Sequence, residues 1–277
     1  MIRGLYTAAS GMMVQMEKQD VISNNLANVD TTGYKKDQTI IKVFPSFQLY
    51  RKDDEREITP SGIESKLTPI GVLGTGAQVQ DVYTDQVQGA ILETSNSTDF
   101  AIRGDGFFAV DTPNGLKISR NGNFYVSGDQ YVVDGNGNRV LGINQENRLG
   151  YMKVTGELNI TGNEISGITV EPLNRQINGV NVQGTEGINS MAIIEIQDKT
   201  QLAKEGANYY SLGGINQLNF RKGGDILQGA LEKSNVNIIK EMVEMIQCSR
   251  AYETNQKTFQ FQDEALNKVV TEVGKWA

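Results

Sequence analysis

The chain has 277 residues, no histidine, a single cysteine and a formal net charge of -7. This length suffices for two or three domains, and the sequence has no basic stripe that could contact phosphates, which argues against a nucleic-acid partner. Without histidine, the commonest general base and metal ligand is missing, so we predict no enzyme, no cofactor and no small-molecule substrate.

No apolar run approaches the ~18–20 residues that cross a bilayer. The start, Met1–Leu5, carries one basic residue but no continuous apolar segment, so we expect no cleaved secretory signal. A chain of this kind that leaves the cytoplasm would use another route. Cys248 lies in a helical pattern and is interpreted as a small packing residue rather than a nucleophile.

The carboxy-terminal stretch, roughly 234–275, predicts one long uninterrupted helix. Ser234 or Asn235 can cap its start and Gly274 its end. At about 1.5 Å per residue it would be roughly 55–60 Å long, deeper than the core of one chain this size. Its apolar side chains alternate in spacings of four and three, as in a coiled-coil seam, with a second line beside them. The seam holds Ile238, Met242, Met245, Tyr252, Phe259, Leu266, Val270 and Val273, and the second line Ile239, Val243 and Ile246.

A second amphipathic helix is predicted at the amino terminus, from Gly4 to Val29. Two helices that cannot bury their apolar faces alone are most simply satisfied by packing on each other. The sequence therefore predicts an α+β fold, with the long terminal helices paired as a coiled coil and a mainly antiparallel β domain inserted between them. The amino-terminal line holds Leu5, Ala9, Met12, Met16, Gln19 and Leu26, with Ala8 and Ile22 beside it.

Between the helices the composition changes twice. The polar run Asn24–Lys36 ends the first helix, either as an ordinary stop or as a turn whose side chains bond to a neighbouring subunit. Residues 39–76, with a short strand at Ile40–Phe44 and the mixed charges of Arg51–Glu57, predict an exposed connector or a long hairpin. We expect terminal helical segments at 1–38 and 228–277, and a β-rich domain over 77–227.

Short alternating runs between glycine and asparagine turns indicate the β domain, a folded-over sheet or irregular barrel with one short helix near Asp198–Gly206. The predicted strands are Gln78–Thr84, Asp99–Arg103, Gly106–Asp111, Leu116–Ser119, Phe124–Val126, Gln130–Val133, Arg139–Gly142, Ile168–Val170, Ser190–Gln197 and Asn208–Leu212.

Two motifs favour turns and strands over ligand sites. Asp134–Asn138 resembles the opening of a calcium loop, but Arg139 stands where glycine is required and Gln145 where a bidentate glutamate is needed. A hairpin turn is the better interpretation. Gly104–Ala109 superficially matches a dinucleotide fingerprint, but a strand rather than a helix follows it, so we predict no metal or cofactor there.

Three ordered stretches resemble bacterial flagellar rod and hook proteins. Asn24–Lys35 is similar to their amino-terminal signature. Gln88–Phe108 and Arg120–Phe124 resemble their β-domain core. Ser234–Asn237, Met242–Ile246 and Arg250–Lys257 are similar to their carboxy-terminal signature. The length resembles that of a distal-rod protein or a similarly long proximal-rod relative. The resemblance implies a structural subunit that polymerises helically through its terminal helices into a hollow drive shaft for motility. It also implies export through the flagellum's own apparatus to the basal body, where the partners are further copies and other rod and hook proteins.

On this interpretation the terminal segments supply the contacts between subunits. The alternatives are a hook subunit, a carboxylate enzyme, or a secreted adhesin or tail-fibre-like protein that stacks sugars on exposed tyrosines such as Tyr125, Tyr131, Tyr209 and Tyr210. The predicted interface residues are Leu5, Met12, Met16, Ile22, Asn25, Leu26, Asn28, Met242, Met245, Arg250, Tyr252, Phe259 and Leu266.

Overall fold

The chain divides into two compact units. The helical unit comprises Met1–Asn24, Asp37–Tyr83 and Ile239–Ala277, and the β unit comprises Asn25–Lys36 and Thr84–Ile238. The computed structural model describes residues 2–59, 62–144, 146, 148–161, 164–172, 180–183, 189–196, 199–206, 208–212, 218–222 and 225–273.

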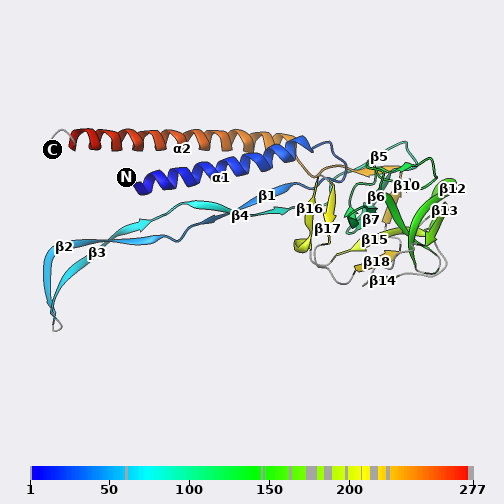
Figure 1. Ribbon diagram of the computed structural model, residues 1–277, viewed down its shortest axis with the longest axis horizontal. Coiled ribbons are helices and arrows are strands. Elements are labelled where there is room, and N and C mark those ends of the chain that lie inside the picture. The colour runs from blue at the N-terminus through cyan, green and yellow to red at the C-terminus, as the bar shows by residue number, and fades with distance from the viewer. Residues whose placement is uncertain are drawn as a thin grey trace. The chain divides into compact units, whose positions relative to one another are not determined.

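Two long helices dominate the helical unit. Helix α1 spans Ile2–Ala27 and helix α2 spans Ile238–Val273, so both predicted helices are confirmed. They lie side by side and antiparallel (Figure 1). Neither is long and apolar enough to cross a membrane. The chain leaves α1 through a turn in which Gly33 has a φ of 69°, a conformation that glycine adopts without strain.

The segment after α1 forms a two-stranded ribbon (Figure 1). Strand β1 (Asp37–Val43) pairs with β4 (Ala77–Thr84), and β2 (Phe47–Thr59) pairs antiparallel with β3 (Gly62–Leu73). Of the two predicted alternatives for residues 39–76, the long hairpin is therefore the one observed. The ribbon lies against α1, because the Ala77 amide donates to the Ser10 hydroxyl at 3.4 Å.

The β unit is built around one large sheet with the strand order β13-β12-β11-β15-β7-β8-β17-β16, in which the paired strands are antiparallel. Two short pairs, β5 with β20 and β6 with β19, accompany it, and β14 and β18 pair in parallel. The bounds are β5 Ile91–Glu93, β6 Phe100–Arg103, β7 Phe107–Thr112, β8 Gly115–Ser119, β9 Tyr125–Val126, β10 Val132–Val133, β11 Arg139–Ile143, β12 Leu149–Thr161, β13 Glu164–Pro172, β14 Val180–Gln183, β15 Ser190–Glu195, β16 Ala203–Glu205, β17 Tyr209–Ser211, β18 Leu218–Lys222, β19 Asp225–Gln228 and β20 Ala230–Glu232.

Both faces of the central strands are covered. Successive residues of a strand point to opposite faces, and Phe107 and Phe108 accordingly belong to two separate apolar clusters. Phe108 packs with Phe124 at 5.2 Å between ring centroids, and Phe107 packs with Tyr210 at 5.6 Å. The central strands β7 and β15 are therefore buried almost throughout, and they differ in this from the short alternating runs predicted for the β domain.

Two predictions in the β unit need correction. The long hairpin of β12 and β13 was expected only as Ile168–Val170, because glycines such as Gly150 weaken the strand pattern. The backbone of Glu171 in β13 occupies the space that a side chain at Gly150 would need, so a close approach of strands requires this glycine. The short helix predicted near Asp198–Gly206 is present as one 3-10 turn, Lys199–Gln201, but β16 follows it within the predicted range.

The turn at Asp134–Asn138 is a hairpin connection between β10 and β11, as predicted. The amides of Asn136 and Asn138 both donate to the Asp134 carboxylate at 2.9 Å, and Tyr209 also donates to it. The carboxylate is therefore used to hold the turn. Among the described residues, no group of three or more acidic or cysteine side chains is arranged to hold a metal ion.

A buried ion cluster within the β unit ties the segment after α1 to β20. Lys35 and Arg120 both pair with Glu232, Arg120 at 3.4 Å, and all three side chains are almost fully buried. The Gly89 amide donates to the Glu232 carboxylate at 2.9 Å, and Lys35 donates to the Val87 carbonyl at 2.8 Å. Burial lowers the pKa of Lys35, and Glu232 acts against that shift. We call Lys35, Arg120 and Glu232 the Glu232 cluster.

Polar side chains of the Asn24–Lys36 turn bond to the same chain. The Tyr34 hydroxyl donates to Asn25 at 3.1 Å and Thr32 donates to Asn121 at 2.6 Å. The Lys36 amide donates to the side chain of Asn235 at 2.8 Å. The turn therefore fixes the segment that leaves α1 against the segment that leads into α2, within the β unit.

Candidate subunit interface

The contact between α1 and α2 includes a row of small and polar residues. Gly4 faces the side-chain amide of Gln262, and a side chain at Gly11 would come within 2.9 Å of Asn255. The Cys248 thiol donates to the Gln15 carbonyl at 2.9 Å. We call this the contact row; it consists of Gly4, Gly11 and Gln15 on α1 and Cys248, Asn255 and Gln262 on α2, and we include the buried Ala8 and Glu241, which continue it at helical spacing.

Cys248 is buried in this row, as its interpretation as a packing residue requires. Burial raises the pKa of its thiol, which keeps the sulfur protonated and unreactive. Glycines at a spacing of seven on α1 let the polar side chains of α2 approach closely. Ala8 and Cys248 are the buried apolar residues of the row, so the row itself contributes little hydrophobic stabilisation.

The contact row does not coincide with the predicted seam. On α2, each residue of the row stands one position before every second position of that seam. Met245, Tyr252, Phe259 and Leu266 are half-buried beside the row, as are Leu5, Met12 and Leu26 on α1. Met16 and Met242, by contrast, are 53% and 51% exposed. Of the other predicted interface residues, Ile22 and Asn25 are buried, Asn28 is half-buried and Arg250 is exposed.

Large apolar side chains on both helices remain uncovered. On α2 the outer stripe consists of Ile239, Met242, Val243 and Ile246, and Ile239 is 76% exposed. At 100° per residue, most of this stripe lies on the side of α2 opposite Cys248 and the contact row. On α1, Tyr6, Met13 and Met16 are exposed. Contiguous apolar surface of this kind marks a site for a protein partner.

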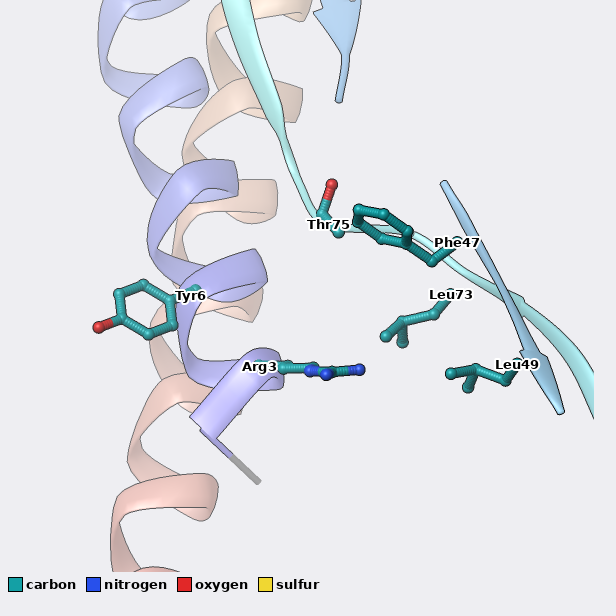
Figure 2. Close-up of a pocket in the computed structure, with 7 residues that line it drawn as sticks. Arg3, Tyr6, Phe47, Leu49, Leu73 and Thr75 are labelled. Atoms are coloured by element: carbon teal, nitrogen blue, oxygen red, sulfur yellow. The ribbon is translucent and has the colours of Figure 1, made fainter. Parts of the chain in front are cut away.

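A cavity of about 510 Å³ lies within the helical unit, between the start of α1 and the ribbon. Its wall is largely apolar, formed by Phe47, Leu49 and Leu73 of the hairpin with Gly74 and Thr75. Arg3 and Tyr6 line it from α1, and Figure 2 shows the Arg3 guanidinium extending toward Leu49 and Leu73.

The helical unit contains almost no core of its own. Within the described residues, its fully buried apolar side chains are Ala8, Val14, Ile22 and Cys248, whereas the β unit contains two extensive apolar clusters. The exposed stripes, the cavity and the scarcity of buried side chains all place the candidate interface on the helices and the ribbon.

Comparisons with known proteins match the chain from end to end. Models described as flagella basal body rod protein, flagellar hook protein FlgE/F/G D1 domain and flagellar basal body rod FlgEFG protein C-terminal match residues 5–35, 101–190 and 227–272. The chain is 32% identical over 271 residues to the flagellar basal-body rod protein FlgG of Borreliella burgdorferi, covering 96% of this chain and 97% of that protein. The chain belongs to the flagellar basal-body rod protein family.

Two proteins of Bacillus subtilis are similar over comparable lengths. The chain is 31% identical over 278 residues to the rod protein FlgG, and the match covers 98% of each chain. It is 28% identical over 295 residues to the flagellar hook-basal body complex protein FlhO, and that match covers 99% of this chain and 100% of FlhO. The resemblance inferred from the three motifs is thereby confirmed. The chain is a structural component of the flagellar basal-body rod, and the adhesin and enzyme alternatives are not favoured.

Proposed function

We propose that this rod subunit polymerises helically through its terminal helices into a hollow axial shaft, without catalysis or cofactor. The observation that carries the proposal is the nearly coreless helical unit beside uncovered apolar stripes on both α1 and α2. Neighbouring copies would cover these stripes, and α1 and α2 would pair as an antiparallel coiled coil along the contact row. A contact between different surfaces of identical subunits builds a filament when the rotation between neighbours does not close a ring.

The proposal assigns partners by the same reasoning. Copies of this chain contact one another along the shaft, and other rod and hook proteins contact its ends. The predicted interface residues on α1 and α2 belong to these contacts, with Met16, Met242 and Arg250 available on the surface of the single chain.

A weakly packed helical unit also suits delivery by the flagellar export apparatus. Ordering the backbone costs about 1–2 kcal/mol per residue. The small apolar area buried along the contact row offsets only part of that cost in a single chain. We therefore expect the terminal segments to be easily unfolded before assembly, and to gain stability from the apolar area buried between subunits.

Truncation separates the two units. A chain lacking residues 2–24 and 239–277 retains the β unit with its own clusters, so it should be soluble and folded, but unable to polymerise or to restore flagella to a strain lacking this protein. Circular dichroism, sedimentation and electron microscopy of basal bodies measure these outcomes. If chains truncated at both ends still built working rods, the terminal helices would not be the assembly elements.

A further inference from the structure

The cavity beside α1 has the chemistry of a receptor for an aromatic side chain with an adjacent acid. Its wall is apolar, and Arg3 brings a positive charge to it. Among the described residues, no side chain forms an ion pair with Arg3. A guanidinium pairs best with a carboxylate, with which it forms two parallel hydrogen bonds.

The chain carries a matching element on α2. Phe261 is 69% exposed and is an exposed aromatic side chain in the second half of that helix. Glu264, also exposed, follows three residues later, a spacing that places two side chains next to each other on a helix surface. Phe261 and Glu264 thus present an aromatic ring and a carboxylate together.

Phe261 does not fill the cavity of its own chain. The neighbouring Gln262 packs against Gly4 in the contact row, and a helix turns by 100° per residue, so Phe261 lies to the side of that row. Its exposure leaves it available to another molecule.

We propose that Phe261 of a second copy of this chain inserts into the cavity, where Glu264 of that copy pairs with Arg3. The inference rests on the proposed polymerisation and assigns one of its contacts. Both chemical features match: the ring covers Phe47, Leu49 and Leu73, and the carboxylate neutralises the guanidinium. A volume of about 510 Å³ falls in the range of pockets that enclose a ligand and readily holds one aromatic side chain.

The positions of the cavity and of Phe261 determine how neighbouring copies are arranged. Because Gly4 packs on Gln262, the cavity beside Arg3 and the Phe261 ring lie at the same level along the helix pair. The contact therefore joins copies side by side. Since the two surfaces differ, each copy uses its cavity for one neighbour and Phe261 for another, and the array stays open when the rotation between neighbours does not close a ring.

Charge reversal tests the pairing in cells. Arg3→Glu and Glu264→Arg should each lower the fraction of flagellated cells at least roughly fivefold, the factor that loss of about 1 kcal/mol per contact produces. The double variant should restore at least half of the wild-type fraction, because the charges again match. Asp263→Arg is the control. It makes the same change of charge at the residue directly before Glu264, which lies on another side of the helix. Single variants that behave like Asp263→Arg, or a double variant no better than the singles, would overturn the proposal.

A cross-link distinguishes this contact from the proposed function as a whole. Full-length chains carrying Leu73→Cys are co-expressed with full-length chains carrying Phe261→Cys, and isolated rods are oxidised. The proposal predicts a disulfide-linked dimer that appears only when both variants are present. Rods that assemble without the cross-link, or with a cross-link to a different protein, would refute the cavity contact and leave the polymer intact. If the wild-type chain formed no rods, the polymerisation itself would be refuted.

Discussion

Replacing Val243 by aspartate should abolish rod assembly while leaving the single chain as stable as before. Val243 lies in the middle of the outer stripe and is 48% exposed, so a carboxylate there stays hydrated in the monomer. In the polymer it would be buried among apolar side chains without a partner, which costs several kcal/mol. At 1.4 kcal/mol for each factor of ten, a loss of about 3 kcal/mol weakens every contact more than a hundredfold. We expect no flagella by electron microscopy and no swimming in soft agar.

Val126→Asp provides the matched control. Val126 is 43% exposed on β9, so the chemical change and the starting exposure are nearly the same, but the position lies in the β unit. Thermal unfolding of both variants should agree with the wild type within about 0.5 kcal/mol, as for most surface substitutions. Normal motility with Val243→Asp would exclude the outer stripe from the subunit interface.

Replacing Glu232 by alanine should destabilise the β unit by about 3–5 kcal/mol, since it leaves two buried cations, Lys35 and Arg120, without their carboxylate. For a domain of this size the melting temperature should fall by roughly 10 °C. Because the cluster joins the segment after α1 to β20, a motility defect should accompany the loss of stability at growth temperature.

Two further variants test whether the loss of stability comes from the buried cluster. Glu205→Ala removes a carboxylate that pairs with Lys117 at 2.7 Å but is half-exposed, so it should cost less than about 1 kcal/mol. Lys35→Met should cost less than Glu232→Ala, because Glu232 keeps Arg120 as a partner. If Glu232→Ala were as mild as Glu205→Ala, the cluster would not be what fastens this segment.

The two terminal helices could be predicted because their apolar spacing is a local property of the sequence. The face of each helix that packs against the other helix was harder to predict. A seam chosen for its large apolar residues selects Met16 and Met242, but the intrachain contact uses Gly4, Gly11 and Asn255 instead. The signal was present as small and polar residues repeating every seven positions. It has no hydrophobic periodicity, so a search for apolar faces passes over it.

The Glu232 cluster could not be predicted in the same way. Lys35, Arg120 and Glu232 are far apart in the sequence, and no periodicity connects a lysine in a polar turn with a glutamate in a short strand. Only the folded β unit brings them together. The hairpin of β12 and β13 was missed for a related reason, since its glycines serve strand packing that is visible only in the tertiary structure.

Hydrogen exchange of the dilute monomer tests the central claim most directly. If neighbouring copies supply the missing core of the helical unit, amides of residues 2–24 and 239–273 should exchange rapidly in the single chain, while the strands around Phe108 and Ile193 remain protected. In assembled rods the same helical amides should become protected. Strong protection of both helices already in the monomer would show that α1 and α2 are complete without partners, and would contradict the account.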